Sequence, residues 1–426
     1  MSRLCDGAFC ADRASPARAQ RAEGILRATL WVRLTSVPNS QPGFSFLVRN
    51  DAAQDDRFAS ALAILTQAIA ARAFPGCSLA VTYRGELVAH KGFGRFTYDA
   101  SSSAVSPATI FDVASLTKVV ATTTMAMVLY ERGVLDLETP VTAVVPEFAA
   151  CQFTASESTA WESTASEFTK RAARRSEVTL RMLLAHTSGL PAYEKLFLRA
   201  KTREELLRAA FGTELIADLG TRAEYSDIGF IILGVALERL ADEPLDRFCQ
   251  REVFGPLAMS HTTFTPAKSL RDQIPPTADD RTFRHRLIQG EVQDENASVL
   301  GGVAGHAGLF STAEDLARFA HAMLNGGHPI LRADTVELFT RRESAPEGTS
   351  RALGWDTPSP PSQSGKYFSA RSFGHLGYTG TSLWIDPERQ LSITLLTNRT
   401  WPDCQNQAIK QVRPAFHDAV VEALEK

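Results

Sequence analysis

The chain has 426 residues, of which 44% are hydrophobic and 22% are charged, as is usual for a folded globular protein. This length exceeds what one hydrophobic core normally supports, so two lobes or domains are expected. Lys and Arg total 45 and Asp and Glu total 48, which leaves a formal net charge of −3 without a polybasic block. That balance argues against a nucleic-acid-binding or membrane-surface protein, and no apolar run approaches the ~18 residues of a membrane-spanning helix.

The 6 cysteines and 9 histidines show no arrangement typical of a metal site. No Cys-x-x-Cys pair and no His-Glu-x-x-His motif occurs. At this chain length and cysteine density a disulfide framework is not expected, and buried or incidental thiols in a reducing compartment are predicted instead. We expect neither a metal nor another cofactor.

Residues 1–55 are predicted to be a disordered or misassigned leader rather than a domain. Arginines recur there among Ala, Ser and Pro, and the apolar patch 25–37 is interrupted by Arg27 and Arg33. A secretory signal peptide has an uncharged apolar stretch and a small-residue cleavage site. Because that pattern is missing, a cytoplasmic location is favoured, and a periplasmic location stays open.

Residues 56–426 are expected to form one domain. Apolar residues at helical spacing over 58–69 predict a first helix. The alternating runs 77–83 and 86–90 flank an Arg-Gly turn and predict a hairpin. A long helix is predicted from Ser115 to Arg132, because a glycine follows its last residue.

The rest of the chain is predominantly helical until its last strands. Residues 152–176, rich in Ser, Thr and Glu, indicate an exposed low-complexity insertion. A strongly apolar helix is predicted over 228–240. The β-rich runs 381–386 and 391–398 predict a second hairpin, and a last helix is expected over 406–424.

Early and late strands that enclose a helical middle predict an α/β fold of the α+β type. We expect a mostly antiparallel sheet flanked by helices and built from both chain ends, with an inserted all-α lobe. The α/β lobe should cover about 56–112 and 300–426, and the helical lobe about 113–299.

Ser115 and Lys118 form the first arrangement that can carry chemistry. Ser115 opens the predicted helix, where free N–H groups and the positive end of the helix dipole favour developing negative charge. Lys118 lies one turn away on the same face. A serine hydroxyl is a weak nucleophile at neutral pH and needs an adjacent base, which this spacing supplies. Taken alone, the pair also fits an N-cap serine followed by an exposed lysine.

A Tyr-Ser-Asp segment precedes the apolar helix 228–240. The Tyr225 hydroxyl can shuttle a proton, and the Asp227 carboxylate can accept a hydrogen bond from Lys118. Asp227 is also a candidate N-cap for the helix that follows.

A third segment, residues 375–381, leads into the strand of the second hairpin. Gly377 is expected to let a substrate backbone approach that strand closely. The backbone N–H of Tyr378 can join that of Ser115 to form an oxyanion hole.

These three elements, in this order, resemble the motifs of the serine β-lactamase and penicillin-binding-protein superfamily. The match is closer to the class C β-lactamase and esterase branch, where the middle element is Tyr-x-Asn and the third can be His-x-Gly. Segments 74–76, 183–190 and 305–312 fit the same branch, and the resemblance runs from roughly residue 57 to residue 424. It implies a β-lactamase/transpeptidase-like fold.

The resemblance implies a serine hydrolase that forms a covalent acyl-enzyme on an ester or amide of a small molecule or peptide. Ser115, Lys118 and Tyr225 would be catalytic, and Asp227, His375, Gly377 and Tyr378 would bind substrate or the oxyanion. Alternatives are a D-alanyl-D-alanine carboxypeptidase, a D-amino-acid amidase or a true β-lactamase. A non-enzymatic homologue that binds peptidoglycan or a partner is the remaining alternative, and retention of all three catalytic residues argues against it.

Two departures from the family pattern bear on the substrate. Asp227 stands where better-known members have Asn, and its charge favours ammonium over amine at Lys118. Tyr225 is therefore expected to be the base or proton shuttle, held by Lys118 as a polarised phenolate. His375 stands where many members have Lys and should be mostly neutral at pH 7. Both changes predict that substrates with a carboxylate are disfavoured relative to neutral esters.

Two further histidines belong to segments of the resemblance. His306 either lines the site or has a structural role, and His186 is expected to belong to the scaffold. No Gly-x-Ser-x-Gly motif supplies a competing nucleophile.

Overall fold

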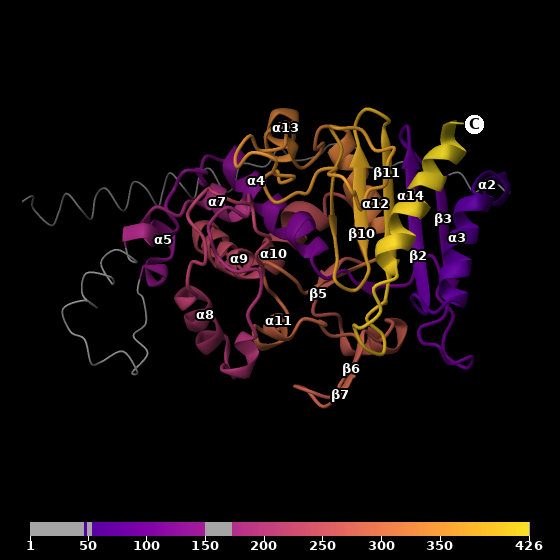
Figure 1. The fold of residues 1–426 in the computed structure, drawn as a ribbon, viewed down its shortest axis with the longest axis horizontal. Coiled ribbons are helices and arrows are strands. Elements are labelled where there is room, and N and C mark those ends of the chain that lie inside the picture. The colour runs from indigo at the N-terminus through magenta and orange to yellow at the C-terminus, as the bar shows by residue number, and fades with distance from the viewer. Residues whose placement is uncertain (1–46, 49–52, 150–172, 426) are drawn as a thin grey trace, which may run out of the picture. The chain divides into compact units, whose positions relative to one another are not determined.

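The computed structural model of the chain describes residues 47–48, 53–149 and 173–425. Its largest sheet has six strands in the order β1-β3-β2-β11-β10-β9, and neighbouring strands are antiparallel except β1 with β3 (Figure 1). The strands are β1 (Leu47–Val48), β2 (Gly76–Tyr83), β3 (Glu86–Gly94), β9 (Phe373–Leu376), β10 (Ser382–Asp386) and β11 (Leu391–Thr397). The predicted antiparallel sheet built from early and late segments is confirmed.

Both predicted hairpins are present. Arg84 and Gly85 join β2 to β3 with φ values of 50° and 84°, and such positive values suit the two-residue turn of a twisted hairpin. In the second hairpin β10 pairs with β11, so that Asp386 lies opposite Leu391. Pairing of β11 with β2 then joins the two hairpins into one sheet.

Alternation along the strands divides their side chains between two apolar cores. In β2, Leu79 and Val81 belong to one core and Ala80 between them belongs to the other. In β10, Trp384 belongs to the first core and Leu383 to the second. Both faces of the sheet are therefore buried.

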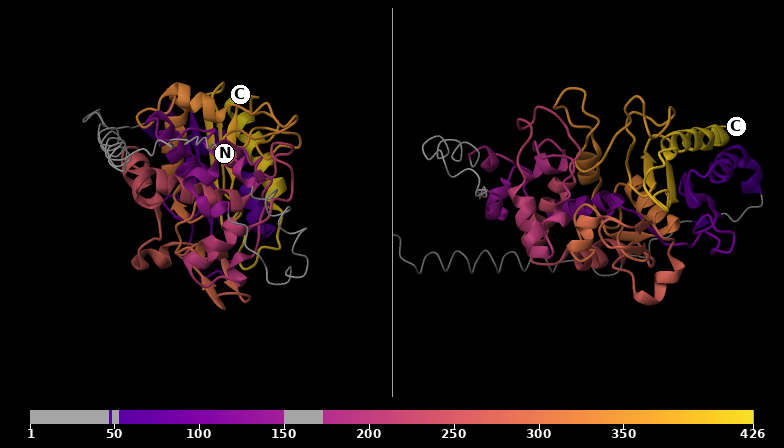
Figure 2. Two further views of the ribbon diagram at one scale, coloured as in Figure 1. Left: turned by 90° about the vertical axis from the view of Figure 1, so that its left-hand side faces the viewer. Right: turned by 60° about the horizontal axis from the view of Figure 1, so that its bottom comes forward.

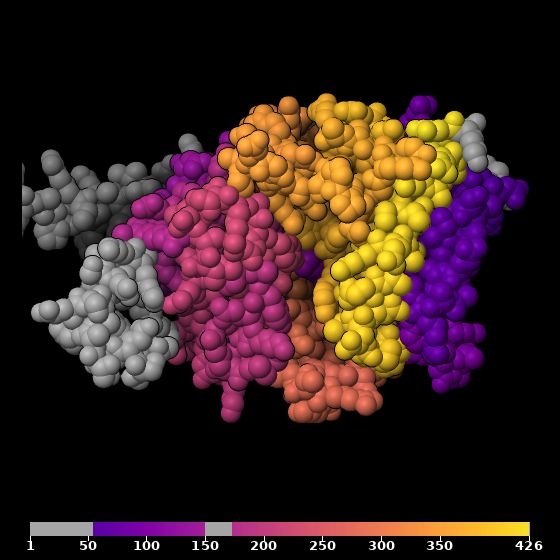
Figure 3. All heavy atoms as spheres, in the orientation of Figure 1, coloured from indigo at the N-terminus to yellow at the C-terminus, as the bar shows by residue number. Residues whose placement is uncertain are grey.

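Helices cover each face. On one face, α3 (Ala59–Ala70), which follows the short α2 (Ala53–Arg57), packs beside α14 (Ile409–Glu425), as Figures 2 and 3 also show. On the other face, α12 (Ala313–Leu324) contacts β2, β10 and β11. This arrangement confirms the sheet flanked by helices.

Most other helices fall in the region predicted as the helical lobe. They are η1 (Lys118–Thr123), α4 (Thr124–Glu131), α5 (Val141–Val144), η2 (Pro146–Phe148), α7 (Leu180–Leu184), η3 (Leu196–Leu198), α8 (Arg203–Gly212), α9 (Asp227–Ala241), α10 (Leu245–Cys249), η4 (Gln250–Phe254), η5 (Lys268–Gln273) and α11 (Glu295–Val299), and α13 (Ala333–Thr340) follows later.

This lobe is not purely helical, contrary to the expectation. It contains β5 (Thr263–Phe264), β6 (Ala278–Asp280) and β7 (Arg286–Ile288). β5 joins β8 (Leu309–Ser311) and β4 (Phe111–Asp112) in a small sheet, and β6 pairs with β7. Strands of two or three residues are too short to show an alternating pattern in the sequence.

Two predicted boundaries need correction. Regular structure begins before residue 56, because β1 pairs with β3 and α2 starts at Ala53. The rest of the predicted leader lies outside the described residues, as does the predicted insertion up to residue 172. The last residues of the predicted insertion belong to the fold, since Arg175 is buried and donates a hydrogen bond to the Phe211 carbonyl at 2.7 Å.

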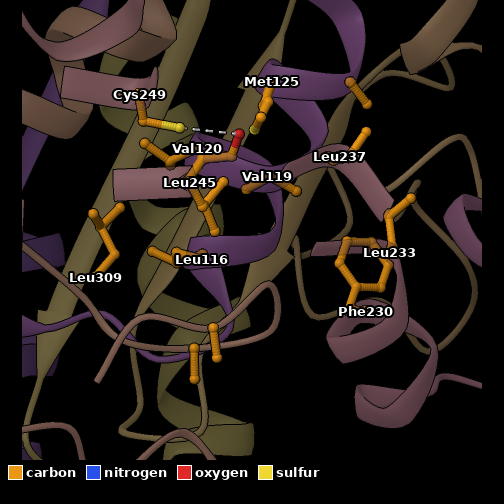
Figure 4. Close-up of a cluster of buried hydrophobic side chains, with 14 of the residues drawn as sticks. Leu116, Val119, Val120, Met125, Phe230, Leu233, Leu237, Leu245, Cys249 and Leu309 are labelled. Atoms are coloured by element: carbon orange, nitrogen blue, oxygen red, sulfur yellow. Dashed lines mark hydrogen bonds between the residues drawn. The ribbon is translucent and has the colours of Figure 1, made fainter. Parts of the chain in front are cut away.

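The helices that carry the site share one buried apolar cluster (Figure 4). Val119 and Val120 of η1 belong to it together with Phe230 and Leu233 of α9, and the two helices are in contact. This packing fixes η1, whose first residue is Lys118, relative to the start of α9.

Candidate active site

Ser115 lies in a strained turn directly before a helix. Helical structure starts at Leu116 and continues through η1 into α4, so the predicted helix that Ser115 opens is confirmed. Ala114 has a φ of 48°, a left-handed conformation that costs a residue with a side chain about 1–3 kcal/mol. Asp112 stabilises the turn by accepting the Ala114 N–H at 2.8 Å. The turn places Ser115 directly before the first helical residue and leaves it partly exposed.

Lys118 is buried and donates three hydrogen bonds. Its Nζ lies 2.9 Å from Ser115 Oγ, 2.6 Å from Asp227 Oδ1 and 3.0 Å from the carbonyl oxygen of His306. The side chain is 0% exposed, so its ion pair with Asp227 is shielded from water. The alternative in which Lys118 is an exposed helix residue is therefore wrong.

Tyr225 links Ser115 to Asp227. Its hydroxyl oxygen lies 2.7 Å from Ser115 Oγ and donates to Asp227 Oδ1 at 3.0 Å. Because Tyr225 gives its one hydroxyl proton to Asp227, Ser115 is the donor in the other bond. His186 packs its ring 5.0 Å from that of Tyr225 and accepts the Ser226 N–H at 3.0 Å, which fits its expected scaffold role.

Two adjacent residues at the start of α9 have different roles. Ser226 is the N-cap, because its Oγ accepts the Gly229 N–H at 3.0 Å. The expectation that Asp227 caps this helix is wrong, since Asp227 is already its first residue. The Asp227 carboxylate is thereby directed to Lys118 and Tyr225.

Burial changes the acidity of both proton-handling groups. It lowers the pKa of Lys118, and the Asp227 carboxylate offsets part of that shift. Burial and then Asp227 raise the pKa of Tyr225 well above its usual value. The expected phenolate is therefore wrong, because both effects favour the neutral phenol and Lys118 directs its hydrogens to other oxygens.

Two backbone N–H groups at the site are unpaired. Neither the Ser115 N–H nor the Tyr378 N–H donates a hydrogen bond to any residue that the structure describes. The two segments are tied together, since Thr379 Oγ1 donates to the Asp112 carbonyl at 2.8 Å. Unpaired N–H groups on fixed segments are typical donors of an oxyanion hole.

Gly377 makes room for the protein's own backbone. A Cβ at this position would overlap Thr381 Oγ1 and lie 2.5 Å from the Val113 carbonyl oxygen. Thr381 Oγ1 donates to that same carbonyl at 3.0 Å. Contrary to the expectation, the space left by the glycine receives the segment before Ser115 and not a substrate backbone.

His375 is buried and neutral. It is 3% exposed, and its Nδ1 lies 2.8 Å from the Leu376 carbonyl oxygen. Burial, followed by the positive charges of Lys118 and Arg351, lowers its pKa to about 3. The predicted neutral histidine is confirmed.

His306 contributes to the site through its backbone, and its side chain belongs to the scaffold. The carbonyl accepts from Lys118, while Nε2 lies 2.8 Å from Asp294 Oδ1. Burial tends to raise the pKa of Asp294, but His306, then the Ala297 N–H and then Lys118 outweigh it and lower that pKa. Asp294 also caps α11 by accepting the Ala297 N–H at 2.7 Å.

We expect Lys118→Met to lower the free energy of unfolding by about 3–5 kcal/mol, because it leaves the Asp227 carboxylate without a cation. Adding Asp227→Asn should recover at least half of that loss. Urea unfolding of the two variants measures both effects, and the exposed Lys268→Met serves as control, with a change within ~0.5 kcal/mol. Equal stability of the single and double variants would show that Lys118 does not compensate a buried charge.

Sequence reasoning missed Arg351. Its Cζ lies 5.6 Å from the centre of the Tyr225 ring. A single arginine far from any motif gives no local signal, and its position follows only from the path of the chain before β9.

None of the helices among the described residues is long and apolar enough to cross a membrane. Among the same residues, no three His, Cys, Asp or Glu side chains are grouped as metal ligands would be. The described cysteines Cys77, Cys249 and Cys404 carry free thiols.

The sequence profile of the Beta-lactamase family matches residues 62–413. An N-acetylmuramyl-L-alanine amidase of Bacillus subtilis strain 168 is 31% identical over 364 residues, covering 77% of this chain and 78% of the relative. A protein of Escherichia coli K12 with the provisional name D-alanyl-D-alanine carboxypeptidase is 29% identical over 361 residues, covering 76% and 79%.

Solved structures show a similar fold. EstCE1, described as a hydrolase with promiscuous acyltransferase activity, has a TM-score of 0.67 at 20% identity over 87% of this chain and 100% of that chain. A penicillin-binding protein homologue from Caulobacter crescentus has a TM-score of 0.66 at 19% identity over 86% and 98%. The expected β-lactamase/transpeptidase-like fold is confirmed.

Proposed function

Because this chain belongs to the Beta-lactamase family and is a serine hydrolase, we propose that it cleaves a carboxylic ester or amide through an acyl-enzyme on Ser115. The continuous contacts among Ser115, Tyr225, Asp227 and Lys118 carry this proposal. A protein that only binds peptidoglycan or a partner gains nothing from a buried ammonium directed at a serine oxygen, and burying that charge is costly. The contacts therefore support an enzyme over a retired homologue.

In acylation, Ser115 Oγ attacks the substrate carbonyl carbon. Its proton moves to the Tyr225 oxygen while the Tyr225 proton passes to Asp227, so the phenol stays neutral throughout. Lys118 stabilises the developing charge on Oγ through a charge-assisted hydrogen bond. The N–H groups of Ser115 and Tyr378 stabilise the carbonyl oxygen as it becomes an oxyanion.

Breakdown of the tetrahedral intermediate uses the same path in reverse. Asp227 returns the proton to Tyr225, and Tyr225 protonates the leaving alcohol or amine as its bond to the carbonyl carbon breaks. In deacylation, water attacks the ester carbonyl and gives one proton to Tyr225, whose own proton passes to Asp227. The bond to Ser115 Oγ then breaks, Tyr225 returns a proton to that oxygen while Asp227 reprotonates Tyr225, and the acid leaves. An asparagine at position 227 would lack the basic oxygen at the end of this path.

Of the two bond types in this proposal, the amide is favoured by the relatives. Both curated relatives are named for cleavage of amide bonds, in one case a peptide that ends in D-alanine. The same residues can act on an ester and on an amide. Cleavage of an amide requires protonation of the leaving nitrogen, and Tyr225 supplies that proton.

Partitioning of the acyl group tests the common intermediate. Phenyl acetate and 4-nitrophenyl acetate differ only in their leaving groups, so both should give the same ratio of methyl acetate to acetate when methanol competes with water. Product analysis by NMR measures the ratio. A ratio that changes with the leaving group would contradict a shared acyl-enzyme and favour direct attack by water.

A further inference from the structure

Glu295 is a carboxylate at the edge of the site that the proposed reaction does not use. It is the first residue of α11 and directly follows Asp294, which contacts the His306 ring at 2.8 Å. The His306 carbonyl in turn accepts a hydrogen bond from Lys118 at 3.0 Å. These contacts fix the start of α11 relative to the ammonium that holds the Ser115 oxygen.

The segment that carries Tyr193 runs from the catalytic Asp227 to α11. Ala192, directly before Tyr193, accepts the Asp227 N–H at 2.8 Å. The carbonyl of Glu194, directly after Tyr193, accepts from Asn296 Nδ2 at 2.9 Å. The backbone of Tyr193 is therefore held on both sides, while the residue itself is 38% exposed. An exposed aromatic ring on a fixed backbone can contact a ligand without much ordering of the protein.

A second exposed tyrosine lies close to the same carboxylate. Tyr378, whose N–H belongs to the proposed oxyanion hole, is 49% exposed. Arg399 holds it in place by donating from Nε to the Tyr378 carbonyl at 2.7 Å. Burial is the main cause that raises the pKa of both Tyr193 and Tyr378, and the negative charge of Glu295 adds to it in each case. This shared effect is expected of a carboxylate near both rings.

The Glu295 carboxylate has no cation of its own. It accepts its own backbone N–H, and among the described residues it forms no ion pair. Arg284 is the cation that acts on it, but that guanidinium donates to Asp280 at 2.9 Å and to the carbonyls of Val292 and Gln293 at 2.7 Å and 2.6 Å. Burial raises the pKa of Glu295, so the carboxylate has lost water without gaining a partner.

The other carboxylates of the site are already compensated. Asp227 faces Lys118 at 2.6 Å, and Asp294 contacts the His306 ring. Glu295 is thus the carboxylate that lacks a partner, and two tyrosine rings lie near it. An ammonium group is attracted both by a carboxylate and by the faces of aromatic rings, so it would supply what this place lacks.

The proposed mechanism says which part of a substrate lies there. Tyr225 protonates the leaving group, and its ring is bordered by His375 at 6.0 Å and Arg351 at 5.6 Å. Glu295 lies instead near Tyr378, whose N–H holds the carbonyl oxygen, and so faces the acyl part. We infer that Glu295, flanked by the two exposed tyrosines, binds an ammonium group on the acyl part of the substrate. This inference rests on the proposed function and names its substrate class, acyl compounds that carry a positive charge.

Two 4-nitrophenyl esters of equal shape test the role of Glu295. The 4-(trimethylammonio)butanoate and the 5,5-dimethylhexanoate differ only in a charged nitrogen in place of a carbon, and release of 4-nitrophenolate reports on both. The same pair with two more CH₂ groups covers a longer reach from Ser115. Wild-type protein should prefer the cation in at least one pair. Glu295→Gln should lower the cation-to-neutral ratio of kcat/KM there by about 10- to 100-fold, because it removes the charge and keeps the shape.

Variants of the aromatic ring and a matched control complete the test. Tyr193→Phe keeps the ring face and should keep the preference, whereas Tyr193→Leu should reduce it by about 3- to 10-fold. Glu337→Gln removes the same charge from an exposed position of α13 and should leave the ratio at the wild-type value.

Three outcomes overturn the inference. They are a wild type that does not prefer the cation in either pair, a Glu295→Gln ratio within twofold of wild type, and an equal loss for the cationic and the neutral ester. Failure of the proposed function looks different, because wild-type protein would then cleave none of the esters faster than buffer does, or Ser115→Ala would cleave them as fast as wild type. That pattern would overturn the premise and the inference together.

Discussion

Replacing Ser115 with alanine is expected to reduce kcat/KM for a chromogenic short-chain ester by at least about 10⁴-fold, because no acyl-enzyme can form without its oxygen. Ser115 is partly exposed in a turn, so the free energy of unfolding should change by less than ~1 kcal/mol. The exposed Ser101→Ala is the matched control and should keep wild-type activity. Steady-state kinetics and urea unfolding check both statements. Residual activity above a hundredth of wild type would rule out Ser115 as the nucleophile.

Lys118 and Tyr225 are expected to behave as one unit. Lys118→Met and Tyr225→Phe should each lower kcat by about 10²–10⁴-fold, since each removes a contact to the Ser115 oxygen that is needed in the same proton transfer. The double variant should be no more than about threefold worse than the poorer single variant, because losses within one catalytic unit are not additive.

This comparison of single and double variants requires that every variant stays folded. Tyr225→Phe retains the ring that packs against His186, so its effect should be confined to the hydroxyl. Lys118→Met is destabilised by the unpaired Asp227, so the assay is run well below its melting temperature, with folding verified by circular dichroism. Losses that multiply in the double variant would mean that the two residues act in separate steps.

The sheet and the three motif segments were predictable because their signals are local. The Arg84-Gly85 turn between alternating runs specifies a hairpin by itself, whatever surrounds it. Lys118 three residues after Ser115 specifies a side-chain contact through the geometry of one helical turn, and the hydrogen bond between them bears this out.

The errors concern choices that local pattern cannot make. Ser226 and Asp227 are both good N-caps, and tertiary contacts with Lys118 decide which one enters the helix. The left-handed conformation of Ala114 has no signal in the sequence, because no glycine stands at that position. Arg351 meets Tyr225 only through the fold, so no local pattern in the sequence indicates that contact.

Covalent labelling tests the central claim most directly, namely that Ser115 is activated by its buried neighbours to form an acyl-enzyme. A serine-directed phosphonate probe should add one equivalent to the native protein, and peptide mapping should place it on Ser115. Lys118→Met should react at least about 100-fold more slowly, and urea-unfolded protein should not react. An adduct on another residue, or labelling that proceeds equally without Lys118, would contradict the account.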